Sequence, residues 1–323
     1  MRALAGLALA VVAAVSATGQ TAGHDLGQAQ AALQAGEADK ALELLKPLTQ
    51  SGASQAEAHN LSCRVLLTLE HWDAAAGECE QAVKMDGGNS EYHHWLGRAL
   101  GERADRASFL NAYSLAKRAR GEFEEAVRLN GRNAEALADL GEFYYSAPGV
   151  VGGGIDKAEG VVAQLDQVDG ARAHELRGRI AEERKDFAAA ERDFKQAIAV
   201  GAHPAFQWNA LASYYRRRQR WEEMESAVRG CLTAAQRDKR AGVALYDGGS
   251  LLIATKRDPA LAAKMIEAYL AGTVKSEEAP AFVAHTRLAR LKAQAGDVEA
   301  AKAEKAAALA LAHEYKPAQD LKF

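Results

Sequence analysis

The chain has 323 residues, of which 48% are hydrophobic and 26% charged, a balance typical of a globular protein and not of a disordered one. It contains only 6 prolines and much alanine, which favours helices, because alanine loses least conformational freedom in a helix and proline breaks one. The net charge of −3 lacks the basic excess of a nucleic-acid-binding protein, so no nucleic-acid partner is expected.

The N-terminus is typical of a signal peptide. Arg2 supplies the positive charge, residues 3–15 form an apolar run of 13 residues, and Val15 and Ala17 are small residues suited to cleavage after position 17. This run is shorter than the roughly 20 residues that span a bilayer. We therefore expect a signal peptide over 1–17, a short mature segment over 18–21, a periplasmic or secreted location, and no membrane insertion after cleavage. An uncleaved anchor or a buried N-terminal helix is the alternative.

A pattern of about 34 residues repeats along the rest of the chain. Within residues 171–204, two amphipathic segments flank a turn near Lys185, and small residues (Gly178, Ala190 and Ala197) stand at positions 8, 20 and 27. Small side chains at these positions let two antiparallel helices approach closely. The frame recurs eight times, starting at Ala22, Ala56, Ser90, Ala134, Ala171, Ala205, Gly242 and Phe282.

This frame resembles the tetratricopeptide repeat (TPR), whose hallmark is the same set of small positions with aromatic residues between them. The resemblance implies an all-α fold, an α-solenoid of about eight helical hairpins that winds as a right-handed superhelix over residues 22–315 and leaves 316–323 as a C-terminal tail. The expected second helices end at glycines, which adopt the left-handed C-cap conformation without steric cost. These are Gly87, Gly131, Gly170 and Gly201.

Two repeats carry insertions. The third has about ten extra residues within 101–116, which remain compatible with helix and predict a kink or loop near 108–111. The fourth has a glycine-rich loop over 147–155, which does not match a phosphate-binding loop because Ile155 and Asp156 follow where lysine and serine or threonine are needed. Residues 90–200, with their long third repeat, also resemble the regulator-of-microtubule-dynamics family of TPR proteins, whose cytoplasmic roles do not suit an exported chain.

No pattern of residues indicates catalysis, a cofactor or a metal. His93 and His94 are adjacent, so on a helix they point about 100° apart, and the sequence has neither an H-E-x-x-H motif nor a paired cysteine motif. A G-x-S-x-G nucleophile elbow is also missing. We therefore expect a binding protein that is not an enzyme and holds no metal or cofactor.

TPR arrays bind an extended peptide or a partner helix on their concave side, and the resemblance implies a groove formed by positions 2, 5, 9, 12 and 13 of each first helix. The residues are Asn60, Arg64, His94, Arg98, Glu142, Tyr145, Glu175, Arg179, Asn209, Arg216, Arg217 and Tyr246. Their mixed charge suits protein recognition. The basic run at 216–220 either meets an acidic ligand or is a solvated helix end, where cations oppose the helix dipole.

The leading functional hypothesis is an exported scaffold that binds a peptide or protein partner in this groove. The alternative is a solenoid that binds an apolar small molecule or a lipid, for which the insertions supply Phe109, Leu110, Val150 and Val151. A third hypothesis is an accessory domain of an enzyme in which the inserted loops acquired catalysis.

The repeat frame also predicts a disulfide between Cys63 and Cys79. These are positions 8 and 24 of the second repeat, and in an antiparallel hairpin that turns near position 16 they lie at the same level. An oxidising compartment allows such a bond to persist. Cys231, at position 27 of the sixth repeat, is expected to remain a free core thiol. Burial of all three cysteines as small core residues is the alternative.

Overall fold

The computed structural model describes residues 23–50 and 55–323, so the predicted signal peptide lies outside the described residues. This described part consists of helices without strands, arranged as eight consecutive antiparallel hairpins. The first four hairpins pair residues 23–35 with α2 (Ala38–Leu48), α3 (Gln55–Thr68) with α4 (Trp72–Met85), α5 (Ser90–Arg106) with α6 (Phe109–Leu129), and α7 (Ala134–Ser146) with α8 (Ile155–Leu165). The last four pair α9 (Gly170–Glu183) with α10 (Phe187–Val200), α11 (Pro204–Arg217) with α12 (Trp221–Arg237), α13 (Gly242–Thr255) with α14 (Pro259–Ala271), and α15 (Ala281–Gln294) with α16 (Val298–Leu311). A short helix, α17 (Lys316–Gln319), and two single turns, η1 (Gly149–Val151) and η2 (Lys239–Ala241), complete the chain.

The first helices begin where local chemistry favours a helix start. Those of the second to eighth hairpins start within one residue of the repeat starts expected from the sequence. Asn133 caps α7, since its side chain accepts hydrogen bonds from the backbone N–H groups of Glu135 and Ala136 at 3.1 and 3.0 Å. Asp169 caps α9 in the same way, and Pro204 is the first residue of α11, where its missing N–H costs nothing.

The left-handed turns lie within the hairpins, and not between them as the sequence analysis expected. None of the four expected glycines has a positive φ, and α8 ends at Leu165, several residues before Gly170. The chain instead adopts positive φ at position 15 of six repeats, where as few as three residues separate the antiparallel helices. These residues are Gly36, Glu70, Lys185, Gln219, Lys256 and Gly296. The third and fourth repeats lack this turn because their insertions replace it.

Small residues at position 8 allow the helices of a hairpin to pack closely. A Cβ atom at Gly97 would lie 2.6 Å from the Phe123 ring, and one at Gly178 would lie 3.0 Å from the Phe194 ring. Carbon atoms in contact are normally about 3.5–4.0 Å apart, so these crossings have no room for a larger residue.

A histidine and a carboxylate join the two helices in four of the hairpins. The histidine is at position 4 of the first helix, and its Nδ1 lies 2.6–3.0 Å from a carboxylate oxygen on the second helix. The pairs are His59–Glu78, His93–Glu122, His174–Asp193 and His285–Glu304. This arrangement accounts for His59 and His93 without a metal, and no group of three or more potential metal ligands occurs in residues 23–50 and 55–323.

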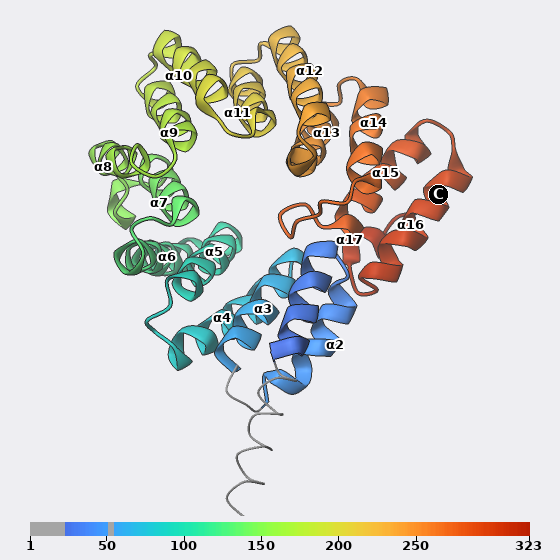
Figure 1. The fold of residues 1–323 in the computed structure, drawn as a ribbon, viewed down its shortest axis with the longest axis horizontal. Coiled ribbons are helices and arrows are strands. Elements are labelled where there is room, and N and C mark those ends of the chain that lie inside the picture. The colour runs from blue at the N-terminus through green and yellow to red at the C-terminus, as the bar shows by residue number, and fades with distance from the viewer. Residues whose placement is uncertain (1–22, 51–54) are drawn as a thin grey trace, which may run out of the picture.

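The solenoid closes into a ring, because the last hairpin packs against the first two (Figure 1). Phe282 is fully buried, stacks edge-on with Tyr315 at 4.8 Å, and shares one core cluster with Leu26 and Leu61. Asp39 accepts a hydrogen bond from the backbone N–H of His313 at 2.8 Å. Burial of each large side chain contributes about 1.5–3 kcal/mol, whereas an exposed polar contact contributes up to about 1 kcal/mol, so apolar packing dominates the closure.

The C-terminal segment takes part in this closure. Residues 316–323 were predicted to form a tail, but α17 lies within them and Ala318 is fully buried in the same core cluster. Tyr315, which precedes α17, donates a hydrogen bond to Glu70 at 3.3 Å across the closure. The segment folds back on α15 and α16, and its buried Ala318 adds to the apolar core at the closure, which a repeat frame alone does not reveal.

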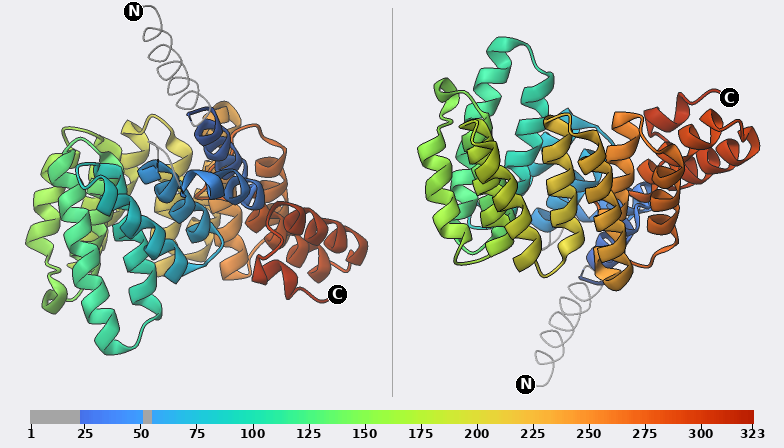
Figure 2. Two further views of the ribbon diagram at one scale, coloured as in Figure 1. Left: turned by 90° about the horizontal axis from the view of Figure 1, so that it is seen from below. Right: turned by 90° about the horizontal axis from the view of Figure 1, so that it is seen from above.

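The insertion in the third repeat lengthens both helices of its hairpin. The break falls at Ala107 and Ser108, close to the expected kink, and α5 and α6 extend over 17 and 21 residues. Figure 2 shows this hairpin projecting beyond the rest of the ring.

In the structure, Cys63 and Cys79 form a disulfide, with their Cα atoms 5.3 Å apart. Cys231 is a free, buried thiol that contacts the carbonyl oxygen of Ala244 at 3.3 Å, and burial raises its pKa to about 12. Such a thiol is protonated and unreactive at neutral pH.

Among the described helices, none combines the length and apolar character needed to cross a membrane.

Candidate functional site

The inner side of the ring holds a cavity of about 1280 Å³. Its walls come from α3, the start of α4, α5, α6, α7, α13, α15 and α17, and from the loops of residues 147–151 and 272–280. Charged and apolar side chains both line the cavity, and arginines stack on several of its aromatic rings, which makes the cavity amphipathic. Its charged residues include Arg64, Glu70, Arg98, Glu102, Asp139, Glu277, Glu278 and Arg287, and its apolar residues include Trp72, Trp95, Phe109, Tyr113, Phe143, Val150, Val151 and Tyr246.

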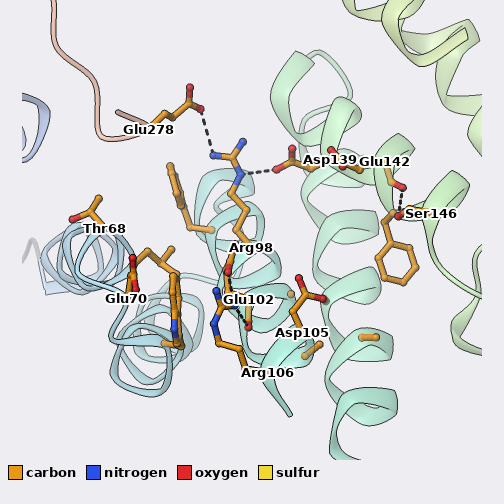
Figure 3. Close-up of a pocket in the computed structure, with 18 of the residues that line it drawn as sticks. Thr68, Glu70, Arg98, Glu102, Asp105, Arg106, Asp139, Glu142, Ser146 and Glu278 are labelled. Carbon is orange, nitrogen blue, oxygen red and sulfur yellow. Dashed lines mark hydrogen bonds and ion pairs between the residues drawn. The ribbon is translucent and has the colours of Figure 1, made fainter. Parts of the chain in front are cut away.

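Arg98 lies between carboxylates from opposite sides of the cavity (Figure 3). Its Nε donates to Asp139 of α7 at 2.5 Å, and its Nη1 is 3.8 Å from Glu278 of the 272–280 loop. His94 also bonds Asp139, at 2.8 Å. Burial would raise the pKa of Asp139, but the hydrogen bond from His94 and the charge of Arg98 outweigh it and lower the pKa to about 2. Asp139 is therefore ionised at any physiological pH.

Arg64 makes a second ion pair across the ring. Its guanidinium donates to both carboxylate oxygens of Glu277, with 2.9 Å between Nε and Oε2, and both side chains are only 12% exposed. Arg64 and Arg98 also stack on Trp95, with their Cζ atoms 4.9 and 4.7 Å from the ring centroid. Two arginines and a tryptophan thus form a compact recognition surface for carboxylates.

The two insertions form an apolar lip on the cavity. Phe109 and Val150 both line it, although they are 86% and 71% exposed, and Leu110 beside them is 80% exposed. The loop that carries Val150 has a fixed shape, since Arg120 donates to the carbonyl oxygen of Val151 at 3.2 Å and Gly152 (φ 100°) leaves the space that this guanidinium fills. Exposed apolar side chains held in place are typical of an interaction surface.

A smaller pocket of about 360 Å³ continues along the concave side over α7, α9 and α11. In it, Arg179 donates to the Tyr145 hydroxyl at 2.7 Å, and Arg217 forms a bidentate pair with Glu182 at 2.8–3.0 Å. Burial raises the pKa of Tyr145 to about 12. Arg216 is exposed and has no ion-pair partner among the described residues, so it alone of the two arginines is available to a ligand.

Nine of the twelve residues expected in the groove line one of these two pockets. They are Arg64, Arg98, Glu142, Tyr145, Glu175, Arg179, Arg216, Arg217 and Tyr246. The other three, Asn60, His94 and Asn209, are at most 9% exposed and lie in the packed interior, which corrects their assignment. All three occupy position 5, but so do Glu175 and Tyr246, which line the pockets, so the position alone does not decide the outcome. At the buried sites the next hairpin covers the side chain; Asn209, for example, donates to the carbonyl oxygen of Ala244 on α13 at 2.8 Å.

The acidic residues Glu277 and Glu278 were not among the residues predicted from the sequence to line the groove. The available signal was the spacing between the seventh and eighth repeats, which is 40 residues instead of 34. Trp95 and Arg287 also line the cavity, at positions that the groove pattern does not include; Arg287 stacks on Tyr246 at 4.9 Å.

The architecture is that of an α-solenoid of helical hairpins, a class of repeat protein. Comparison with solved structures identifies the type of helical repeat. A thermophilic TPR protein from Thermus thermophilus matches with a TM-score of 0.50 and 18% identity, over 60% of this chain and 98% of that one. A TPR protein from Parabacteroides merdae (TM-score 0.47, 13% identity, 85% and 99% covered) and the C-terminal part of one from Cytophaga hutchinsonii (0.43, 15%, 92% and 100%) also match.

The likeness to the Thermus thermophilus protein shows the fold, and the prediction of a TPR solenoid is confirmed. No protein-family profile and no curated protein matches the sequence. The resemblance to the regulator-of-microtubule-dynamics family stays a prediction.

Proposed function

We propose that this protein is an exported scaffold that binds a segment of a protein partner in the central cavity of its ring. TPR-type folds usually mediate protein interactions, which supports the class of function. The observation that carries the proposal is the cavity itself, which combines the arginines at position 9 of two repeats with the apolar lip of the two insertions. No catalytic step is part of the proposal.

The size and lining of the cavity favour a peptide segment as its occupant. A volume of about 1280 Å³ exceeds the roughly 300–1,000 Å³ of typical small-molecule pockets, so a single small ligand would leave much of it filled with water. Arginine and aromatic side chains are enriched at protein interfaces, and Arg64, Arg98 and Trp95 bring both kinds together. An extended peptide can meet the charged wall and the apolar lip at the same time.

Photo-crosslinking from defined positions tests this proposal. We would place p-benzoylphenylalanine at Phe109 or Val150 on the lip, in cells that export the protein, and identify the adducts by mass spectrometry. Met85 and Val200 are matched controls, because they are 45% and 49% exposed but line neither pocket. We expect a protein adduct from the lip positions that the controls do not give. The same adducts from all four positions, or none from the lip, would contradict the proposal.

The second candidate function, binding of an apolar small molecule or a lipid, is favoured by the apolar residues of the cavity lining. They include Phe109, Phe143, Val150 and Val151, of which all but Phe143 come from the insertions. Native mass spectrometry of protein purified without detergent distinguishes the two functions. A bound mass that ionises as a lipid, and that is lost when Phe109 and Val150 are changed to serine, would favour the second.

Export is tested separately at the N-terminus. We expect the mature protein to begin at Thr18, because Val15 and Ala17 suit signal peptidase. N-terminal sequencing of the protein from its native cell decides this. A soluble protein that retains Met1 or Ala3 would contradict the proposed location.

A further inference from the structure

The connection between α14 and α15 is unlike the other connections between repeats. Those at 86–89, 130–133 and 201–203 take three or four residues, whereas this one takes nine, from 272 to 280. It reaches inward to the cavity (Figure 1), where Glu277 and Glu278 are among the lining residues.

The loop has an ordered shape of its own. Lys275 donates hydrogen bonds to the carbonyl oxygens of Tyr269 and Leu270 at 3.0 Å, which ties the loop to the C-terminus of α14. The Tyr269 hydroxyl donates to the carbonyl oxygen of Ala279 at 2.5 Å, and the backbone N–H of Glu278 donates to the hydroxyl of Ser276 at 3.2 Å. The two glutamates are therefore presented side by side toward α3 and α5.

The surface that receives them is the one on which a partner is expected. Arg64 and Arg98 are both at position 9, and in this structure positions 9, 12 and 13 line the concave pockets wherever a groove residue was expected there. Glu277 is held by Arg64 through two hydrogen bonds, and Glu278 lies 3.8 Å from Arg98. The chain thus occupies its own groove with an acidic segment.

We propose that residues 276–278 are an internal occupant of the Arg64–Trp95–Arg98 site, and that an acidic partner segment with two adjacent carboxylates binds there by displacing them. This inference rests on the proposed function and specifies its ligand. The Arg64 guanidinium is only 12% exposed, so leaving it without a carboxylate partner costs free energy. The site therefore favours the exchange of one acidic segment for another over an unoccupied state.

The ring does not depend on the loop for its closure. Phe282 and Tyr315 share one apolar core with the first two hairpins, and Asp39 and Glu70 form hydrogen bonds across the same junction without involving the loop. The loop can therefore leave the site while the ring stays closed, which is what an exchange of occupants requires.

The test uses a synthetic peptide of the loop itself, acetyl-GTVKSEEAP-amide, added to the full-length E277Q/E278Q variant. Binding is followed by the NMR signal of the Trp95 indole N–H, assigned with Trp95→Phe. A tethered segment competes at a millimolar effective concentration, so we expect the wild type to bind the peptide at least about 10-fold more weakly than the variant. Arg64→Gln in the variant should abolish binding, and the peptide GTVKSQQAP should not bind.

Equal binding by the wild type and the variant, or none by the variant, would overturn the proposal. If the E277Q/E278Q variant loses helical content, the single variant E277Q replaces it in the assay. Its affinity for the peptide should then lie between those of the wild type and the double variant. The peptide assay and the crosslinks from Phe109 and Val150 fail independently. Peptide binding without a crosslinked partner would support the acidic binding site and contradict the proposed function. Crosslinks without peptide exchange would support the proposed function and contradict the acidic binding site.

Discussion

Replacement of Gly97 by alanine tests the close helix crossings on which the repeat depends. Gly97 is buried on α5, and its added Cβ would lie 2.6 Å from the Cδ1 and Cε1 atoms of Phe123 on α6. Gly121, on α6 of the same hairpin, is exposed and has no atom within 4 Å of an added Cβ. The two substitutions are chemically identical and differ only in the space around them.

The expected effects follow from two opposing terms. Alanine in place of glycine inside a helix stabilises by about 0.5–1 kcal/mol, and this gain applies at both sites. At Gly97 the Cβ lies about 1 Å inside normal contact distance, and Phe123 is only 7% exposed, so its ring has little room to shift. Overpacking of this kind costs about 1–3 kcal/mol. Gly121→Ala should therefore stabilise slightly, while Gly97→Ala should be about 1–3 kcal/mol less stable than Gly121→Ala.

Hydrogen exchange of the α5 and α6 backbone amides is the appropriate assay, because repeats can unfold separately and a single melting temperature then averages over the array. Urea denaturation followed by circular dichroism gives the matching global value. Equal protection in the two variants would refute the crossing geometry. So would a Gly97→Ala variant more stable than the wild type.

Three further predictions concern single contacts. Cys63→Ala with Cys79→Ala should cost roughly 3 kcal/mol, because the bond spans 16 residues, and non-reducing peptide mapping of the exported protein should recover the linked pair and not a bridge to another cysteine. Arg217→Gln should lower stability by up to about 1 kcal/mol through loss of its bidentate partner, whereas Arg216→Gln should leave the melting temperature unchanged; equal effects would contradict the pairing. The carboxylate of Asp139 has a pKa lowered from 3.8 to about 2 by folding, so its contribution, roughly 2 kcal/mol, is present above pH 4 and lost as the pH falls toward 2. The stability difference between the wild type and Asp139→Asn should shrink over that window, and a difference that stays constant would contradict the assignment.

The sequence was most informative where the physical cause is local. Close packing at Gly97 and Gly178 depends on two helices of one hairpin, so spacing alone identifies it. The pairing of Cys63 with Cys79 is local in the same sense. Positions 9, 12 and 13 also faced the concave side as expected, because a helix fixes which side chains share a face.

The errors arose where the arrangement depends on neighbouring or distant repeats. Position 5 was assigned to the groove, yet Asn60, His94 and Asn209 are buried, whereas Glu175 and Tyr246 at the same position line the pockets. Whether the next hairpin covers this position therefore depends on how each pair of repeats stacks. Ring closure depends on small rotations summed over eight repeats, which no single repeat specifies. The spacing of 40 residues between the seventh and eighth repeats indicates a longer connection, but the pairing of Glu277 with Arg64 depends on the closure and could not be predicted before it was known.

Closure of the ring is the central claim, and a pair of spin-label distances tests it most directly. Labels at Lys40→Cys and Glu314→Cys occupy side chains 61% and 66% exposed, and Lys195→Cys, 58% exposed on α10, supplies a reference on the opposite side of the ring (Figure 1). The native cysteines should not interfere, because two are bonded and the third is buried. By double electron–electron resonance, the distance from residue 40 to residue 314 should be narrow and shorter than that from residue 40 to residue 195. In an open solenoid residue 314 would lie at the far end, so a longer or broad distance to it would contradict the account.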